Sequence, residues 1–357
     1  MELEKIKKVE LSLENLKNKS CVFYFLVQDT KGNAKASIRY TYQIAKLLKD
    51  NGYNTCMIHE KDDYTGVSEW LGSEFMEIKH ESIEKQNLKV SPEDFIVIPE
   101  LYGHVMEQLS NISCGKIVLS QSYDYILETL KPGESWTDYN FFKCITTTEK
   151  QSKYIKSLMR NVDVDVIRPF IPLSFSKKDK PSKPIVSIHT RDQRDTMKVI
   201  KTFYLKYPQY RWITFRDMRG LNESEFSDYL KDSFVSIWVD DISSFGTFPL
   251  ESMISNTPVI GKIPSMKPEW MNEENGIWTT DTISIPDILA EYIQNWLEDN
   301  ISDQLYEKSY STSVEFQNEE LFKTEIINTF DSYIEVRRQN FETQLEKIKQ
   351  PEESTQE

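Results

Sequence analysis

The chain has 357 residues, of which 39% are apolar and 28% are charged, with a formal net charge of −14 at pH 7. This length is enough for two domains that each bury a core. No apolar run approaches 18 residues, and the first 20 residues, rich in Lys and Glu, lack the apolar region of a signal peptide, so neither a membrane span nor secretion is expected. We therefore predict a cytoplasmic globular protein.

The cysteines and histidines show no spacing typical of a metal site. The four cysteines are far apart and lie in or beside apolar runs, at Cys21, Cys56, Cys114 and Cys144. This pattern favours small buried side chains in a reducing compartment. The four histidines are equally scattered, so we expect no bound metal.

The first half of the chain alternates apolar runs with segments of helical periodicity. The predicted strands cover residues 21–27, 53–58, 95–98, 116–119 and 143–146, and the predicted helices cover residues 38–48 and 149–158. Continuous apolar runs are typical of parallel strands buried on both faces. This alternation predicts a parallel sheet with helices on both faces.

A connector rich in proline and lysine, residues 168–184, separates this half from a second α/β pattern. The second pattern predicts strands at 185–189, 211–215, 234–239 and 259–260, and helices at 195–206, 223–232 and 249–254. Beyond residue 285 the chain is predicted to be helical, with a long amphipathic stretch at 318–348. Two consecutive doubly wound units leave a cleft between them.

The clearest ligand motif is a glycine loop between a predicted strand and a predicted helix. The strand ends in Asp240 and Asp241, Gly246 lies in the loop, and the helix is predicted to begin near Pro249. Free backbone N–H groups at such a helix start bind anions or hydroxyls. Glu251, in the first turn, is placed to accept hydrogen bonds from a ribose diol. The alternative is that the aromatic residues of the loop only pack the helix start and that Glu251 is a cap.

This motif resembles the donor-site signature of the retaining GT-B glycosyltransferases, the group 1 family. The residues in register with that signature are Phe245, Gly246, Pro249, Leu250, Glu251, Met253, Pro258, Val259 and Ile260. Ser243 stands where the family has its first glutamate. Residues 267–277 are similar to a further Pro-Glu and Asn-Gly stretch of the family, and Gly32-Asn33 is similar in position to its first glycine loop.

The resemblance implies an α/β fold of the GT-B type, with two Rossmann-like doubly wound domains facing a cleft and a long C-terminal helix. We predict an acceptor-binding domain at 1–172 and a domain that binds a sugar nucleotide at 173–312. Residues 313–357 are predicted to form a helix that crosses back to the first domain, followed by an acidic tail.

The resemblance also implies roles for individual residues. A diphosphate is bound in the family by an arginine and a lysine, for which this chain offers Arg191, Arg194 and Lys198; their spacing does not match the family's, so which arginine binds stays open. The alternative is that they are surface bases of a helix start. Glu251 is expected on the ribose, and Gly32 and Asn33 in an acceptor or phosphate loop. The sugar and phosphate are expected to lie against the donor loop, Ser243, Ser244, Phe245, Gly246, Thr247 and Phe248.

The implied activity is transfer of a sugar from a nucleoside diphosphate sugar to an acceptor hydroxyl, with retention and without a metal or other cofactor. A glycan or small-molecule acceptor is favoured. Residues 150–219 hold 17 basic and 6 acidic residues, whereas 281–357 hold 6 basic and 18 acidic residues. This basic middle keeps open a bacteriophage-type enzyme that glycosylates hydroxymethylated bases of DNA. Loss of the family's glutamate at Ser243 leaves a non-catalytic sugar-nucleotide-binding protein as a further alternative.

Other motifs are weaker. Asp163-Val-Asp165 imitates the metal motif of another glycosyltransferase fold, but it lies in an alternating strand, and we expect a surface edge. His189, at a strand end, either faces the cleft or is a core histidine. Tyr123, Asp124 and Tyr125 follow a predicted strand and are candidates for the acceptor side.

Overall fold

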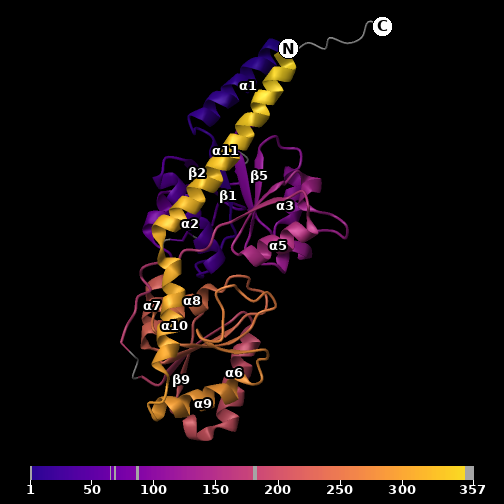
Figure 1. Ribbon diagram of the computed structural model, residues 1–357. Coiled ribbons are helices and arrows are strands. Elements are labelled where there is room, and N and C mark those ends of the chain that lie inside the picture. Colours follow the sequence, from indigo (N-terminus) through magenta and orange to yellow (C-terminus); the bar gives the residue numbers. More distant parts are fainter. Residues whose placement is uncertain (1, 65, 68–69, 86–87, 180–182, 350–357) are drawn as a thin grey trace.

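The computed structural model describes residues 2–64, 66–67, 70–85, 88–179 and 183–349 and contains two parallel β-sheets (Figure 1). The first sheet has the order β3-β2-β1-β4-β5-β6-β7. Its strands are β1 (Val22–Leu26), β2 (Asn54–His59), β3 (Lys79–Ser82), β4 (Phe95–Pro99), β5 (Gly115–Ser120), β6 (Lys143–Thr146) and β7 (Asp163–Val166). We call this sheet and its covering helices the first lobe.

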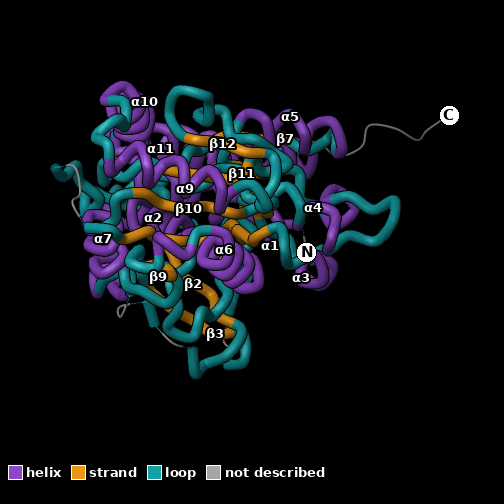
Figure 2. Tube along the Cα trace, turned by 90° about the horizontal axis from the view of Figure 1, so that it is seen from below, coloured by secondary structure: helices purple, strands orange, loops and turns teal. Residues whose placement is uncertain are grey.

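The second sheet has the order β12-β11-β10-β8-β9, and three of its neighbouring strands are seen side by side from below in Figure 2. Its strands are β8 (Ile185–Thr190), β9 (Thr214–Asp217), β10 (Val235–Val239), β11 (Val259–Lys262) and β12 (Ile277–Thr279). We call this sheet and its covering helices the second lobe. The chain passes between the two sheets after β7, within the predicted connector. All pairings in both sheets are parallel, so the predicted α/β fold with two Rossmann-like units is confirmed.

Helices cover both faces of each sheet. Those of the first lobe are α1 (Glu2–Lys17), α2 (Ala36–Asp50), α3 (Gly103–Leu109), α4 (Tyr125–Glu128) and α5 (Glu149–Leu158). Those of the second lobe are α6 (Gln193–Lys206), α7 (Glu223–Asp232), α8 (Thr247–Ile254), α9 (Ile285–Leu297) and α10 (Asp303–Val314), and α11 (Glu319–Lys349) follows. Short 3₁₀ turns lie at Ser73–Glu77, Trp136–Tyr139, Pro208–Tyr210 and Glu315–Gln317.

Burial on both sides explains the uninterrupted apolar strands. Along β1, Phe23 and Phe25 enter a core shared with α2 and α11, whereas Tyr24 and Leu26 enter a core on the opposite face with α3 and α5. Alternate side chains of a strand point to opposite faces, so a strand covered on both faces has to be apolar throughout. The elements not predicted from the sequence include α1, the polar edge strand β3, α3 and α4. β9 begins three residues later than predicted, because residues 208–213 form turns instead.

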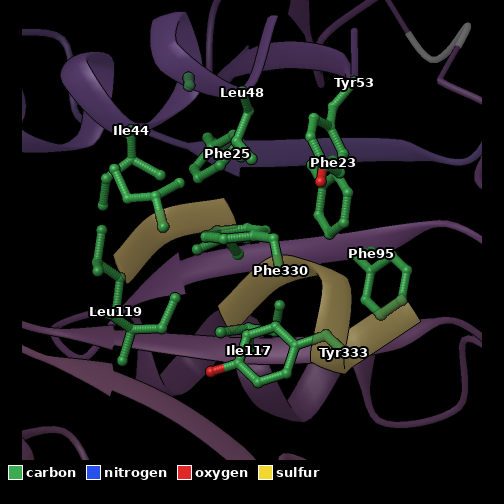
Figure 3. Packing of buried hydrophobic residues seen from close by; sticks show 14 of the residues in the cluster. Phe23, Phe25, Ile44, Leu48, Tyr53, Phe95, Ile117, Leu119, Phe330 and Tyr333 are labelled. Carbon is green, nitrogen blue, oxygen red and sulfur yellow. The ribbon is translucent and has the colours of Figure 1, made fainter. Parts of the chain in front are cut away.

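The long helix α11 belongs to the core of the first lobe. In Figure 1 it runs along that lobe, with α1 beside its far half. Its Phe330 ring packs edge-on against Phe23 with centroids 5.0 Å apart, and Figure 3 shows it among side chains of the sheet and α2. The hydroxyl of Tyr333 donates to Asp165 on β7 at 2.7 Å. The helix therefore crosses from the second lobe to the first.

Truncation of Phe330 is expected to destabilise the protein strongly. Phe330→Ala removes a fully buried ring, and such a change costs about 3–5 kcal/mol because it loses apolar burial and leaves a cavity. Denaturant unfolding followed by circular dichroism measures the loss. Val336→Ala, on the same helix but 40% exposed, serves as the control and is expected to change stability little. Equal effects of the two substitutions would contradict the packing described here.

Candidate active site

A cavity of about 1000 Å³ lies between the two lobes, and we call it the cleft cavity. The first lobe lines it with residues 33–41 at the start of α2, 99–102 after β4, and parts of 121–129 after β5. The second lobe lines it with the end of β8, the loop 218–223 after β9, and the glycine loop after β10. The carboxyl ends of parallel strands are where doubly wound sheets bind ligands, so both lobes present their binding edges to one space.

The glycine loop is shaped by Gly246. Its φ of +75° lies in the left-handed region, and a Cβ built there would lie 3.2 Å from ring atoms of Trp238 and Trp270. The Trp270 indole N–H also donates to the carbonyl of Phe245 at 2.7 Å. Only glycine fits this conformation between two indole rings without strain. The helix α8 starts at Thr247, two residues before the predicted start, and Phe245, Gly246, Thr247 and Phe248 all line the cleft cavity.

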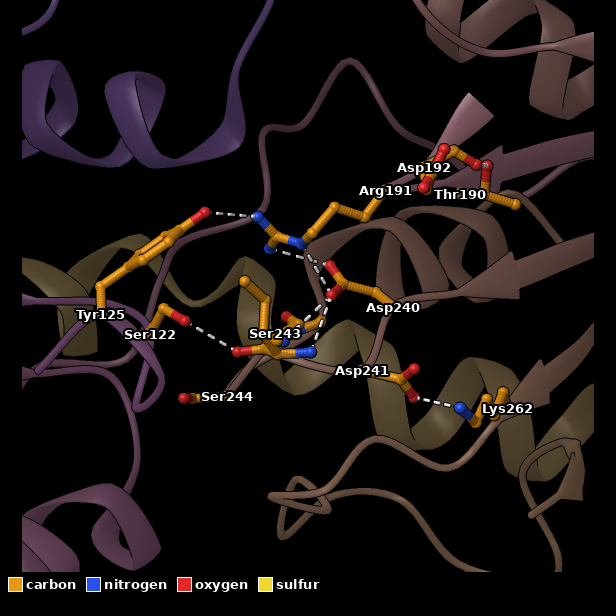
Figure 4. Close-up of polar contacts among 12 residues, drawn as sticks. Ser122, Tyr125, Thr190, Arg191, Asp192, Asp240, Asp241, Ser243, Ser244 and Lys262 are labelled. Atoms are coloured by element: carbon orange, nitrogen blue, oxygen red, sulfur yellow. Dashed lines mark hydrogen bonds and ion pairs between the residues drawn. The ribbon is translucent and has the colours of Figure 1, made fainter. Parts of the chain in front are cut away.

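The two serines of the loop use their hydroxyls within the protein. Ser243 lines the cleft cavity, and its Oγ accepts a hydrogen bond from the backbone N–H of Gly246 at 3.0 Å. Ser244 is buried, and its Oγ accepts from the backbone N–H of Tyr123 in the first lobe at 3.1 Å. Ser122 completes this contact by donating to the carbonyl of Ile242 at 2.8 Å (Figure 4). The loop is therefore held by the opposite lobe.

Arg191 is fixed in the cleft cavity by a carboxylate of the same lobe. Its Nε and Nη2 donate to the two oxygens of Asp240 at 2.9 and 3.0 Å, and its Nη1 donates to the hydroxyl of Tyr125 at 3.3 Å (Figure 4). Asp240 also accepts from the backbone N–H groups of Ile242 and Ser243, both at 3.1 Å. This two-point pairing fixes the plane of the guanidinium, which a lysine could not reproduce.

Glu251 faces the first lobe across the cleft cavity. It is only 3% exposed, and its Oε1 accepts a hydrogen bond from Nη2 of Arg39, on α2. Nη1 of Arg39 also lies 3.8 Å from Oε2 of Glu223, on α7. Burial raises the pKa of Glu223, and the nearby Arg39 opposes that rise. Arg39 and Glu223 both line the cleft cavity, but no sequence motif pointed to either.

Arg194 and Lys198 do not line the cleft cavity. Their side chains are 84% and 70% exposed and pair with neighbours in the chain, Asp192 at 2.6 Å and Asp195 at 3.1 Å. Asp192 caps the N-terminus of α6, which explains why an arginine is tolerated in the first turn. Of the three predicted phosphate cations, the structure brings only Arg191 to the same space as Glu251. The diphosphate role of all three stays a prediction.

Other cations reach the cleft cavity instead. Lys35, Arg39 and Arg219 line it along with Arg191. In the predicted phosphate loop, Asn33 lines the cavity and its side chain donates to the carbonyl of Thr30 at 3.1 Å. Gly32 has a φ of +78° and is not among the lining residues.

About half of the bases in the basic middle of the sequence are paired with acids. Eight of the 17 form ion pairs among the described residues, namely Arg168 with Glu325, Lys183 with Asp232, Arg191 with Asp240, Arg194 with Asp192, Lys198 with Asp195, Lys206 with Asp287, Arg216 with Asp232 and Arg219 with Asp217. A paired cation attracts a phosphate less than an isolated one, because its field is partly cancelled. The charge count of this segment therefore overstates its attraction for a polyanion.

His189 faces the cleft cavity rather than the core. Its ring stacks on Phe248 with centroids 5.0 Å apart, and its Nδ1 has no hydrogen-bond partner within the described part of the chain. Burial lowers the pKa of His189, so the ring is neutral at pH 7. It therefore offers the cavity an aromatic face and a polar nitrogen without charge.

Glu100, which no sequence motif indicated, is a buried carboxyl group at the end of β4. It is 2% exposed, lines the cleft cavity, and its Oε1 accepts from the backbone N–H groups of Gln121 at 3.0 Å and Ser122 at 2.7 Å. Burial raises the pKa of Glu100 to about 7, although these amide donors act in the opposite direction. A lone glutamate after an apolar strand gives no signal in a sequence.

The elevated pKa of Glu100 predicts a pH-dependent stability. Because the folded pKa of about 7 exceeds the ordinary value of 4.5, the group favours folding below 4.5 and that contribution is lost as pH rises through 7. Full ionisation costs about 3 kcal/mol at 1.36 kcal/mol per pKa unit. We expect Glu100→Gln to raise the melting temperature relative to the wild type at pH 8 and much less at pH 5. Melting curves that differ equally at both pH values would contradict this.

The described residues also bear on the expectations that the chain has no metal site and no membrane-spanning helix. No group of three or more His, Cys, Asp or Glu side chains is arranged to hold a metal ion in the part of the chain that the structure covers. Within the same residues, no helix combines the length and apolar character needed to cross a membrane. Asp163 and Asp165 lie on β7, the edge strand of the first sheet, as predicted.

Comparisons with known proteins agree with this geometry. No protein-family model matches the chain. The chain is 23% identical over 262 residues to an alpha-1,6-glucosyltransferase of Actinobacillus pleuropneumoniae serotype 7 (strain AP76), which covers 70% of this chain and 74% of that protein. Similar solved structures include a sucrose-phosphate synthase from Thermosynechococcus elongatus, with a TM-score of 0.62, 14% identity, and coverage of 88% of this chain and 100% of that one.

A further similar structure is that of Anabaena Alr3699/HepE in complex with UDP-glucose, with a TM-score of 0.61, 12% identity, and coverage of 87% of this chain and 99% of that one. The fold is GT-B, as predicted. The predicted class, a glycosyltransferase, is confirmed by the sequence relative, the alpha-1,6-glucosyltransferase.

Proposed function

We propose that this protein transfers a hexose, with glucose favoured, from a uridine diphosphate sugar to a hydroxyl group of a glycan-type acceptor, with retention of configuration. The observation that carries this proposal is the placement of Arg191, Glu251 and the Gly246 loop on one wall of the cleft cavity. The sequence relative is described as an alpha-1,6-glucosyltransferase, and the Anabaena protein was solved with UDP-glucose, which supports the donor.

Each residue has a distinct part in this proposal. Glu251 accepts hydrogen bonds from the ribose hydroxyls, which requires them to displace Arg39 from its carboxylate. Arg191, held by Asp240, binds the diphosphate and stabilises the negative charge that develops on it as the bond from the sugar C1 to the phosphate oxygen breaks. The acceptor oxygen bonds to C1, and its proton passes to the departing phosphate. No metal is required to balance the negative charge on the departing diphosphate, because cationic side chains such as Arg191 supply the positive charge.

The wall opposite the glycine loop supports a glycan acceptor over DNA. On the first-lobe side of the cleft cavity the acids Glu100 and Glu128 balance the bases Lys35 and Arg39, so this side has no excess of positive charge to attract a phosphate backbone. The pairing of about half of the bases in the basic middle points the same way. We also propose that residues 1–172 bind the acceptor and that 173–312 bind the sugar nucleotide. The four free cysteines are all buried, which supports a cytoplasmic location.

Two measurements test the proposal. Calorimetry with UDP and UDP-glucose measures donor binding, and an assay for released UDP, with and without saccharides, measures turnover. We expect micromolar binding and UDP release that saccharides accelerate, with a product whose anomeric configuration, read by NMR, matches that of the donor. Binding without any release would instead establish a non-catalytic protein. Release accelerated by duplex DNA with hydroxymethylcytosine, but by no saccharide, would establish the DNA enzyme.

A further inference from the structure

A second group of buried polar side chains reaches the cleft cavity from the first lobe, where β4, β5 and β6 end. Glu100 and Thr147 both line the cavity and are each 2% exposed. The Thr147 hydroxyl has no hydrogen-bond partner among the residues that the structure describes. The carboxyl group of Glu100 is held in place by the backbone amides of Gln121 and Ser122. Neither side chain has a part in the donor roles given above.

These two groups are suited to bind a neutral hydroxyl. Within the described residues Glu100 forms no ion pair, and burial of a carboxylate without a cation is costly unless hydrogen-bond donors compensate. A ligand hydroxyl supplies such a donor without adding charge, and the unpaired hydroxyl of Thr147 can donate to the ligand or accept from it. Tyr102 and Tyr125 line the same wall and offer aromatic surface to the apolar face of a sugar ring.

We propose that Glu100 and Thr147 form the subsite that binds the acceptor, and that Glu100 accepts a hydrogen bond from a hydroxyl of a carbohydrate. This inference rests on the proposed function and adds the residues that select the acceptor. The location agrees with that role, because Tyr125, on the same wall, contacts Arg191 and so connects the subsite to the predicted diphosphate position.

The ionisation of Glu100 provides a signature that a purely structural role would lack. A carboxylate accepts a hydroxyl hydrogen bond better than a carboxylic acid, so the acceptor KM is expected to fall as pH rises through about 7. The titratable group that faces Glu100 from β6 is the thiol of Cys144, whose pKa is raised by burial and by Glu100 and which stays neutral over this range. No charged side chain in the described residues contributes to the shift of Glu100 itself.

The test compares the wild type with Glu100→Gln and Thr147→Val. The acceptor probes are the α and β methyl glycosides of glucose, galactose and mannose, with UDP-glucose as donor and released UDP as the signal. The carboxamide keeps the shape of the side chain and an oxygen for the backbone amides, but loses the charge. We expect Glu100→Gln to raise the acceptor KM at least tenfold and to abolish its pH dependence, with the Kd for UDP within twofold of the wild type. Thr147→Val is expected to raise the acceptor KM severalfold.

Glu107→Gln is the matched control, because that side chain is 61% exposed and lies outside the cleft cavity. An unchanged acceptor KM in Glu100→Gln, or a pH dependence that persists in it, would overturn the proposal. So would a wild type that binds UDP but is stimulated by none of the six glycosides. A wild type that fails to bind UDP would overturn the proposed function itself, which separates the two failures.

Discussion

Glu251→Gln is expected to weaken binding of UDP about tenfold to a hundredfold, measured as the Kd by calorimetry. A charged acceptor of a hydrogen bond is worth about 1.5–3 kcal/mol, and the carboxamide offers one oxygen where the carboxylate offers two. The same change removes the charge that pairs with Arg39 across the cleft cavity, so the lobes are also expected to separate more readily. Transfer from UDP-glucose is expected to fall at least as far as binding.

The control for this variant is Glu291→Gln, an exposed glutamate on α9, for which no change in UDP affinity is expected. Arg39→Met separates the two functions of Glu251. If Glu251 only held the lobes together, Arg39→Met and Glu251→Gln would reduce transfer to the same extent. If Glu251 binds the ribose, Glu251→Gln loses far more UDP affinity. Unchanged UDP affinity in Glu251→Gln would reject the ribose assignment.

Arg191→Lys is expected to reduce kcat for transfer about a hundredfold, with a smaller change in the Kd for UDP. The guanidinium pairs with both oxygens of Asp240 and still presents Nη1 to the cavity, whereas an ammonium group cannot do both. Loss of one fixed donor to a developing anion typically costs about 2.7–4 kcal/mol. Steady-state kinetics with UDP-glucose measure the change. Arg211→Lys, at an exposed position of the same lobe, is the control.

Arg194→Ala and Lys198→Ala decide which predicted cations act on the diphosphate. In this structure their side chains extend into solvent, pair with Asp192 and Asp195, and do not line the cleft cavity. If either variant loses as much kcat as Arg191→Lys, that residue binds the diphosphate in the working enzyme. If both variants retain the kcat of the wild type, Arg191 is the one of these three residues that binds the diphosphate.

The predictable parts of the fold are those whose secondary structure is determined by the local sequence alone. The strand β10, the turn at Gly246 and the helix α8 follow from an apolar run, a residue that tolerates positive φ, and a helix start. In contrast, β3 has the sequence Lys-His-Glu-Ser and is a strand only because β2 offers it an edge. Such elements are fixed by tertiary contacts, which local periodicity does not contain.

The same distinction applies to the candidate site. The glycine loop and Glu251 were identified because a motif places them together along the chain. Arg39 and Glu100 come from other segments and reach the cavity only when the two lobes face each other. The number of basic residues in 150–219 was also incomplete evidence for phosphate binding. Several of these bases are paired with acids such as Asp240 and Asp287, which lie outside that segment. A charge count says how many cations a segment has, but not which of them are already paired.

The passage of α11 into the first lobe has a consequence for biosynthesis. This helix supplies Phe330 and Tyr333 to the core beneath β1, yet a ribosome makes it after every strand of both sheets. The nascent first lobe therefore emerges with an uncovered apolar face and has to wait for roughly 150 further residues, counted from the end of β7, before it can close. The second lobe, whose strands and covering helices are contiguous in the chain, can complete its own core sooner. We expect the first-made half of this protein to be the last to mature, and to be the part that needs chaperone protection during translation.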